Sequence, residues 1–220
     1  MMASDFSAIV DGGRTMEPRV LNDDLLNRIR DFHSGPDRGY HGWSHPLALL
    51  GLFAQVEDQL DDPLAVRCAI LMHDAIYEPR AKDNEARSAE LAADLLKDSV
   101  PPGSLSRTIR LIEATAKHAI PEDLPADERA DMARFLDMDL AILAAPEAEF
   151  DAYEDGVRHE YRDVPEAAFR AGRAAILENF LAREALYMSD WGREAFEARA
   201  RVNLARSIRQ LREDGPLSGA

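Results

Sequence analysis

Five side chains in this sequence have the chemistry of metal ligands and fall at positions that otherwise carry apolar residues. They are His41, His45, His73, Asp74 and Asp139. An imidazole or carboxylate that is buried without a partner loses its hydration at a large cost in free energy. One divalent metal ion would satisfy several such groups at once. The set therefore predicts a metal site with nitrogen and oxygen ligands.

His45 lies at the start of a helix predicted over residues 44–60. Leu49, Leu52 and Val56 follow it at helical spacing and fall within about 40° of it around the helix axis. His45 is therefore predicted to point into the core. A single histidine at such a position is more often a hydrogen-bonded core residue than a ligand, so the metal assignment depends on its neighbours.

His73 and Asp74 lie at the end of a helix predicted over residues 63–76. The apolar face of this helix runs directly into His73, because Val66, Ala69 and Ile70 precede it at helical spacing. A neighbouring imidazole and carboxylate at a helix end can bind one borderline divalent ion. Such a pair on its own also arises by chance.

Asp137 and Asp139 compete for the fourth ligand position, on a helix predicted over residues 127–144. Asp139 shares its face, within about 60°, with the apolar residues of this helix, whereas Asp137 lies about 160° away. Those apolar residues are Met132, Phe135, Leu136, Ile142 and Leu143. Asp139 is therefore the predicted ligand, with a salt bridge to a buried arginine as its alternative. Asp137 is a candidate for binding a ligand histidine from behind or for orienting water.

Further candidates lie on other segments. Glu85 is predicted to face inward, either to orient water or as an acid favoured near a helix N-terminus. His118 can reach a site only from a helix end. Arg38, Lys117 and Arg158 are the basic groups considered for a phosphate. Tyr161 ends an apolar stripe that is most simply core, and it is a further candidate for substrate contact. His33 and His159 are predicted to lie on the surface.

The periodicity of the whole chain is helical, which predicts an all-α fold. Nine helices are expected, over residues 20–33, 44–60, 63–76, 84–98, 104–118, 127–144, 147–161, 165–187 and 192–213. The length of 220 residues fits one helical domain over 20–213, with an N-terminal arm over 1–19 and a C-terminal tail over 214–220.

Composition narrows the classes of function. A net charge of −15 opposes binding to nucleic acids and to anionic membranes. No apolar run is long enough to span a membrane, and no signal peptide is present, which predicts a cytoplasmic protein. The single cysteine, Cys68, lies in an apolar run and is predicted to be a buried small residue. Homo-oligomerisation stays open.

In order and helical setting, His45, His73-Asp74 and Asp139 resemble the ligands of the HD superfamily of metal-dependent phosphohydrolases. Further motifs resemble a bacterial subgroup of that superfamily: Tyr40-His41-Gly42-Trp43-Ser44-His45, His73-Asp74-Ala75-Ile76-Tyr77, residues 83–89, residues 135–140 and residues 157–161. The first motif is also similar to that of cyclic-nucleotide phosphodiesterases. There the first histidine donates a proton and the second binds metal, although Gly42 stands where those enzymes have asparagine.

The resemblance implies hydrolysis of a phosphoester in a nucleotide or another small phosphorylated molecule. His45, His73, Asp74 and Asp139 would hold the metal and His41 would act as the acid, with Glu85 and Asp137 in supporting roles. Mn, Fe, Co, Ni or Zn suits such a ligand set better than Mg. Two alternatives stay open: a non-catalytic sensor of nucleotides and metal, and a di-iron oxygenase that would need His118 and Glu85 for its second ion.

Overall fold

The computed structural model describes residues 21–213, and all of their regular structure is helical. The all-α prediction is therefore confirmed. The predicted arm over 1–19 and tail over 214–220 lie outside the described residues. None of the helices within 21–213 combines the length and the apolar character that crossing a membrane requires.

Each predicted helix corresponds to one observed α-helix, and two short 3-10 helices accompany them. In chain order they are α2 (Asp23–Phe32), α3 (Ser44–Val56), η1 (Glu57–Gln59), α4 (Pro63–Met72), α5 (Asn84–Leu96), α6 (Pro102–Thr115), α7 (Ala126–Asp139), η2 (Leu140–Ala144), α8 (Glu147–Glu160), α9 (Glu166–Leu181) and α10 (Asp190–Arg212).

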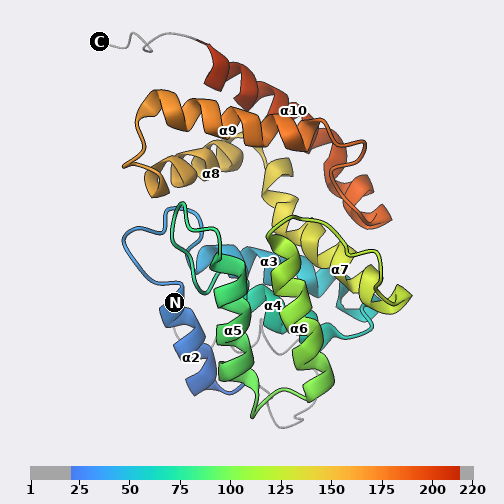
Figure 1. Cartoon of the computed structure of the whole chain (residues 1–220). Helices are drawn as coiled ribbons and strands as arrows, with labels where there is room; N and C mark the ends of the chain where they lie inside the picture. Colours follow the sequence, from blue (N-terminus) through green and yellow to red (C-terminus); the bar gives the residue numbers. More distant parts are fainter. Residues whose placement is uncertain (1–20, 214–220) are drawn as a thin grey trace.

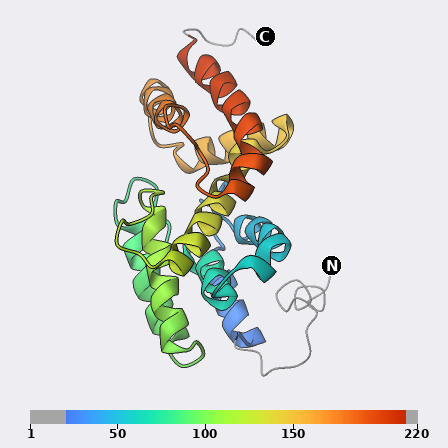
Figure 2. The same cartoon turned by 90° about the vertical axis from the view of Figure 1, so that its right-hand side faces the viewer.

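The helices form two groups that meet around η2 (Figures 1 and 2). Helices α2 to α7 make the larger group, and α8, α9 and α10 lie together on the other side of η2. Each group has its own cluster of buried apolar side chains. Leu52 and Trp191 pack against both clusters, so the apolar core continues from one group to the other.

The end of α4 differs from the prediction, and this difference shapes the site. The helix stops at Met72, and His73 caps it, whereas the apolar pattern predicted helix to residue 76. Arg38 holds the chain after this point: its guanidinium donates to the carbonyl oxygens of His41 at 2.6 Å, Asp74 at 2.8 Å and Ala75 at 2.9 Å. These carbonyls accept from a side chain instead of from a further helical turn.

The end of α7 also differs. One helix was predicted over 127–144, but the α-helix ends at Asp139 and continues as the 3-10 helix η2. Similarly, α9 ends at Leu181, six residues before the predicted boundary. The tighter turn of η2 begins directly after Asp139. Asp139, the last residue of α7, lines a cavity to which both groups of helices contribute, with His73 from one and Phe180 from the other.

Three predictions about single residues are tested by burial, and one of them is wrong. Cys68 is buried, and burial raises the pKa of its thiol to about 12, as expected of an inert core residue. The surface prediction for His33 is wrong, because only 2% of this residue is exposed and its Nε2 lies 2.9 Å from the carbonyl oxygen of Leu71. His159 is exposed as predicted.

Candidate metal centre

The four predicted ligands meet in one place although they come from three different parts of the chain. His45 lies in the first turn of α3, His73 and Asp74 follow α4, and Asp139 ends α7. The two Nε2 atoms of His45 and His73 lie 3.0 Å apart. The nearest oxygen of Asp74 lies 3.1 Å from Nε2 of His73 and 3.6 Å from Nε2 of His45. We call these four residues the ligand cluster.

Asp139 completes the ligand cluster from the opposite helix. His45, His73 and Asp74 each offer one atom within 4.8 Å of the others, a spacing at which one metal ion could contact all three. Asp139 lies outside that triad, but its Oδ1 lies 3.1 Å from Nε2 of His45 and 3.3 Å from Nε2 of His73. This oxygen is therefore as close to both imidazoles as they are to each other.

The spacing within the ligand cluster fits a divalent ion. Ligands about 2.1 Å from a metal are about 3.0 Å apart at adjacent octahedral positions and about 3.4 Å apart at tetrahedral ones. The contacts between imidazole nitrogens and carboxylate oxygens of the cluster, and between the two imidazoles, run from 3.0 to 3.6 Å. All four residues are of types that bind borderline divalent ions.

The tautomer of His73 supports the same reading. Its Nδ1 lies 3.0 Å from the carbonyl oxygen of Ile70, so Nδ1 must carry a hydrogen. Neutral His73 therefore presents a bare Nε2 lone pair to Nε2 of His45. The 3.0 Å contact is satisfied either by a hydrogen on Nε2 of His45 or by a cation between the two nitrogens. A backbone partner of this kind is typical of histidines that bind metal.

Electrostatics keep both carboxylates of the cluster ionised. Burial by itself would raise the pKa of Asp74, but the imidazoles of His73, His41 and His45 hold it well below its usual range. Asp139 behaves likewise, with burial opposed by His73, His118 and His45. Burial lowers the pKa of His45, which favours its neutral form. Burial by itself would lower the pKa of His73, but Asp74 and Asp139 raise it well above its usual value. A metal ion bound among these side chains would take the place of that proton.

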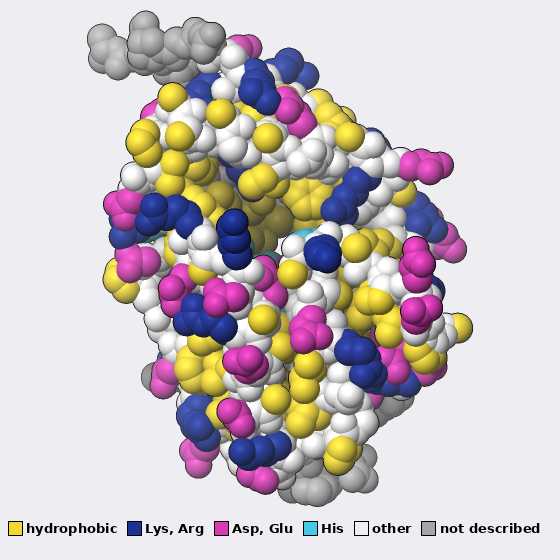
Figure 3. Space-filling model, in the orientation of Figure 1, with side chains coloured by type: hydrophobic (Ala, Val, Ile, Leu, Met, Phe, Trp, Pro, Cys, Tyr) yellow, Lys and Arg dark blue, Asp and Glu magenta, His cyan; other side chains and the backbone are white. Residues whose placement is uncertain are grey.

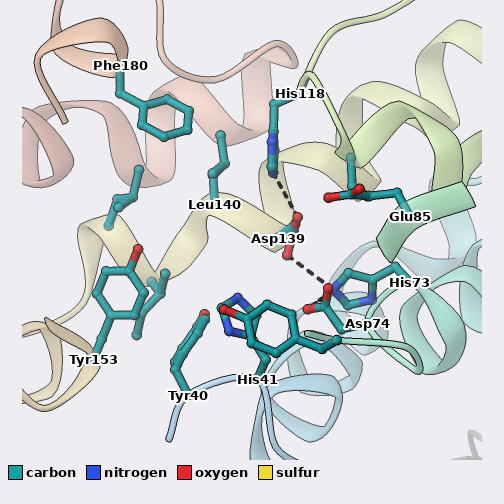
Figure 4. Close-up of a pocket in the computed structure, with 14 residues that line it drawn as sticks. Tyr40, His41, His73, Asp74, Glu85, His118, Asp139, Leu140, Tyr153 and Phe180 are labelled. Atoms are coloured by element: carbon teal, nitrogen blue, oxygen red, sulfur yellow. Dashed lines mark hydrogen bonds and ion pairs between the residues drawn. The ribbon is translucent and has the colours of Figure 1, made fainter. Parts of the chain in front are cut away.

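Beside the cluster, His118 and Glu85 extend the line of polar groups (Figure 4). His118 follows α6 with a positive φ of 43°, and its Nε2 lies 2.9 Å from Oδ2 of Asp139. Asp139 thus faces the two buried histidines with one oxygen and His118 with the other. Glu85 lines the same cavity from the first turn of α5. Both were predicted to be near the site, and the structure brings them there.

His41 lies on the far side of the cavity in a fixed orientation. Its Nδ1 lies 2.8 Å from Oε2 of Glu160, and its ring stacks on Tyr77 with centroids 4.0 Å apart. Glu160 also accepts from the backbone amides of Tyr40 and His41 and from the hydroxyl of Tyr77. The opposite nitrogen of the His41 ring is left for the cavity, which His41 lines.

Asp137 corrects one prediction, because it takes no part in the site. Its oxygens accept from the backbone amide of Met188 at 2.6 Å, and from the amide and hydroxyl of Ser189 at 2.8 and 2.6 Å. These donors precede α10, and Ser189 caps that helix. Asp137 therefore joins α7 to the start of α10. The helical wheel separated Asp137 from Asp139 but could not show this partner.

Both arginines considered for phosphate form hydrogen bonds away from the cavities beside the cluster. Arg38 binds three backbone carbonyls behind the cluster, and Arg158 binds Glu166 and the carbonyls of Tyr161 and Val164. Neither of them lines the cavities beside the cluster, and neither does Lys117. Tyr161, in contrast, lines the larger of these cavities, as a substrate contact would.

Glu160 and Arg80 are site residues that the sequence reasoning missed. Glu160 lies about 60° around α8 from Val157, so the helical argument used for Asp139 would have placed it on the inner face. Arg80 lies in the loop after Tyr77, with a positive φ of 74°, and lines the larger cavity. No periodic pattern marks a loop residue of this kind.

On one side of the cluster, two cavities share part of their lining. The smaller, of about 180 Å³, is lined by His73, Asp74, His118 and Asp139 among others. The larger, of about 590 Å³, shares His41, Glu85 and His118 with it and extends toward α8 and α9. In Figure 3 the same face shows a hollow with apolar side chains around it and histidine at its floor. The side chains of Asp74 and Asp139 line the smaller cavity and are 17% and 11% exposed, so the cluster is reachable from solvent through its carboxylates.

Comparisons with protein-family models, with curated proteins and with solved structures found no match for this chain. Functional inference therefore depends on the geometry of the site and on the motifs in the sequence.

Proposed function

We propose that this protein is a metal-dependent phosphohydrolase of the HD type that hydrolyses a phosphoester of a small molecule. The observation that carries the proposal is the ligand cluster itself. Two histidines present Nε2 atoms 3.0 Å apart beside two carboxylates, at the floor of an open cavity. This arrangement has a simple physical reason if a cation lies among the four side chains.

His45, His73, Asp74 and Asp139 are the residues that would hold the ion. Two imidazoles with two carboxylates suit Mn, Fe, Co, Ni or Zn better than Mg. When bound, a divalent ion supplies positive charge that polarises a phosphoryl group and lowers the pKa of water. The hydrogen bond from Nδ1 of His73 to Ile70 keeps that imidazole in the orientation that binding requires.

His41 is the proposed general acid. As the P–O bond to the leaving group breaks, the leaving oxygen takes a proton from Nε2 of His41, and water supplies the new oxygen on phosphorus. Glu160 accepts at Nδ1, which orients the ring and stabilises the imidazolium before the proton is given up. Stacking on Tyr77 restricts the ring further. Imidazoles are suited to this task because they exchange protons near neutral pH.

The test combines metal analysis with hydrolysis of a panel of nucleotides and other phosphoesters. Wild-type protein should retain a transition metal and hydrolyse part of the panel, while Asp74→Ala should lose both. Asp94→Ala removes an exposed carboxylate of α5 and serves as the control, since its side chain is 85% exposed. Full metal content and full activity in Asp74→Ala would contradict the ligand assignment.

A second variant separates catalysis from binding. His41→Ala should keep the metal and lose hydrolysis, most severely with substrates whose leaving group is a poor one, because these depend most on a proton donor. Undiminished hydrolysis of such substrates by His41→Ala removes this residue from the mechanism. Wild-type protein that binds metal but hydrolyses nothing in the panel would instead indicate a non-catalytic sensor.

One observation keeps a di-iron oxygenase as the second candidate. Asp139 faces the paired histidines with one oxygen and His118 with the other, so it could bridge two ions. Glu85 lines the same cavity and could add a ligand. Protein loaded with iron that shows a di-iron absorption band and consumes oxygen would favour this candidate over the hydrolase.

A further inference from the structure

The larger cavity has a chemical character that the reaction at the ligand cluster does not explain. At the cluster its walls are polar, formed by His41, Glu85 and His118. Away from the cluster, α8, α9 and the loop between them supply Val157, Val164, Phe169 and Ile176. A phosphoryl group needs only the polar end. The apolar end must therefore contact the rest of the ligand or stay exposed to water.

Helix α9 is apolar on two faces, and one of them is turned toward this cavity. Ala174 and Leu177 form its buried face. Phe169, Ile176 and Phe180, together with Gly172, line the cavity instead. Ile176 is 48% exposed and is one of only two large apolar residues that are exposed in residues 21–213. An exposed apolar side chain in a concave wall is typical of a ligand site.

Aromatic rings recur around the cavity. Tyr161 lies near Phe169, with ring centroids 6.3 Å apart, and Phe180 lies near His118, with centroids 6.1 Å apart. All four line the cavity. Aromatic side chains favour offset or edge-on contact with a further planar ring. A volume of about 590 Å³ is within the usual range for a small-molecule site and leaves space for such a ring.

We infer that the substrate is a phosphoester whose alcohol part carries a planar ring, with the phosphoryl group at the ligand cluster and the ring against the apolar face of α9. This inference deepens the proposed function and rests on it for the position of the phosphoryl group. The ring contacts Phe169, Ile176 and Phe180, while Arg80 lies at the edge of the same cavity. An aryl group and a nucleobase both meet this description.

The experiment measures binding rather than turnover, so it does not depend on hydrolysis. Three phosphonates, whose P–C bond is not hydrolysed, serve as probes with Mn²⁺ present: methylphosphonate, 1-naphthylmethylphosphonate and a nucleoside phosphonate. Calorimetry gives their dissociation constants. We expect at least one ring-bearing probe to bind about tenfold or more tightly than methylphosphonate, because ring burial adds apolar contact. The tighter of the two identifies the kind of ring.

Gly172→Leu tests the position of the ring. A Cβ atom at Gly172 would meet no other atom within 4 Å, and Gly172 lines the cavity, so a leucine there is expected to extend into this space. This variant should weaken binding of the ring-bearing probe about tenfold and leave the dissociation constant of methylphosphonate unchanged. Gly51→Leu is the matched control, since Gly51 is also helical and open but lies outside the cavity.

Ile176→Gln and Val202→Gln form a second pair, because these two residues are the exposed large apolar side chains of the described chain. Only Ile176→Gln should weaken the ring-bearing probe. Equal affinity of all three probes, or binding that both Gly172→Leu and Ile176→Gln leave intact, would overturn the inference. Ring-selective binding in a protein that hydrolyses no phosphoester would contradict the proposed function but keep the site for a planar ring beside α9.

Discussion

Asp137 and Asp139 lie on the same helix, both away from bulk solvent, and have opposite surroundings. Asp137 accepts from two backbone amides and one hydroxyl, all hydrogen-bond donors supplied by residues 188 and 189. Asp139 faces His45, His73 and His118, whose ring nitrogens lie 2.9 to 3.3 Å away. The donors around Asp137 satisfy its carboxylate with hydrogen bonds. Around Asp139, imidazole nitrogens, which can each present a lone pair, lie beside the negative charge of the carboxylate.

This difference separates a structural carboxylate from a proposed metal ligand. Backbone amides always carry a hydrogen, so Asp137 fixes the position of α10 at any pH at which it is ionised. Imidazole nitrogens can carry a proton, a metal ion or neither. A carboxylate surrounded by imidazoles therefore takes part in binding equilibria, while one surrounded by amides takes part in folding.

The strongest test of the comparison is metal affinity. Structural zinc sites with four ligands bind with about 10 to 16 kcal/mol, so one ligand contributes about 3 to 4 kcal/mol. Asp139→Asn should therefore weaken binding of Zn²⁺ or Mn²⁺ by about a hundredfold to a thousandfold, measured by competition with a chelator. Asp137→Asn should change it less than about threefold, since it lies outside the cluster. Similar losses in both variants would remove the distinction.

A second test contrasts two buried histidines. His73 has two carboxylates beside it, whereas His33 contacts a carbonyl oxygen through Nε2 and leaves its buried Nδ1 without a hydrogen-bond partner. Burial lowers the pKa of His33 from 6.5 to about 4. The unfolded chain therefore takes up this proton at a higher pH than the folded protein does. The resulting stability is complete above about pH 6.5 and is lost as pH falls toward 4.

The size of this effect follows from the shift in pKa. His33 should account for about 3 kcal/mol of the stability lost between pH 7 and about pH 4. The His33→Gln variant should lose correspondingly less unfolding free energy over that pH range. Urea unfolding of protein freed of metal by a chelator measures it. Parallel pH profiles for wild type and His33→Gln would show that His33 is not buried in its neutral form.

The fold could be predicted from the sequence because its helices are marked by strong periodicity and by prolines and glycines between them. All nine expected helices over residues 21–213 are present. The ends of α4 and α7 could not be placed, because tertiary contacts decide them. The guanidinium of Arg38 binds the chain after α4 from more than thirty residues away in the sequence, and no local propensity encodes such a contact.

The site was predictable to the extent that its residues lie on helices. The phase of α7 distinguished Asp139 from Asp137, and the apolar stripe of α4 led to His73. The arginines were not predictable in this way. Arg38 and Arg158 resembled phosphate ligands in the sequence, but each is engaged by carbonyl oxygens. Hydrogen bonds to backbone carbonyls have no sequence signature, so a free cation cannot be recognised from its type alone.

The third test concerns stability at Asp137. Asp137→Asn replaces one acceptor oxygen by an amide that cannot accept from the donors of Met188 and Ser189. We expect a loss of about 2 kcal/mol in the free energy of unfolding, the cost of buried donors left without an acceptor. Thermal and urea unfolding of the metal-free protein measure it. Asp139→Asn should cost less under the same conditions, and a larger cost there would reverse the comparison.

The smallest effect concerns Arg80, which differs from Arg38 and Arg158 in having no hydrogen-bond or ion-pair partner within residues 21–213. At the edge of the larger cavity it can attract an anionic ligand through charge alone. Arg80→Asn should weaken binding of a phosphonate probe about fivefold at low salt, because it removes the positive charge. Asparagine is the replacement because it tolerates the left-handed backbone at φ 74°. The difference should shrink as salt screens the charge.

Lys82→Asn is the control, because it removes the same charge from an exposed position two residues away, outside the cavity wall. Equal losses in the two variants would mean that only net charge matters, and that the position of Arg80 does not.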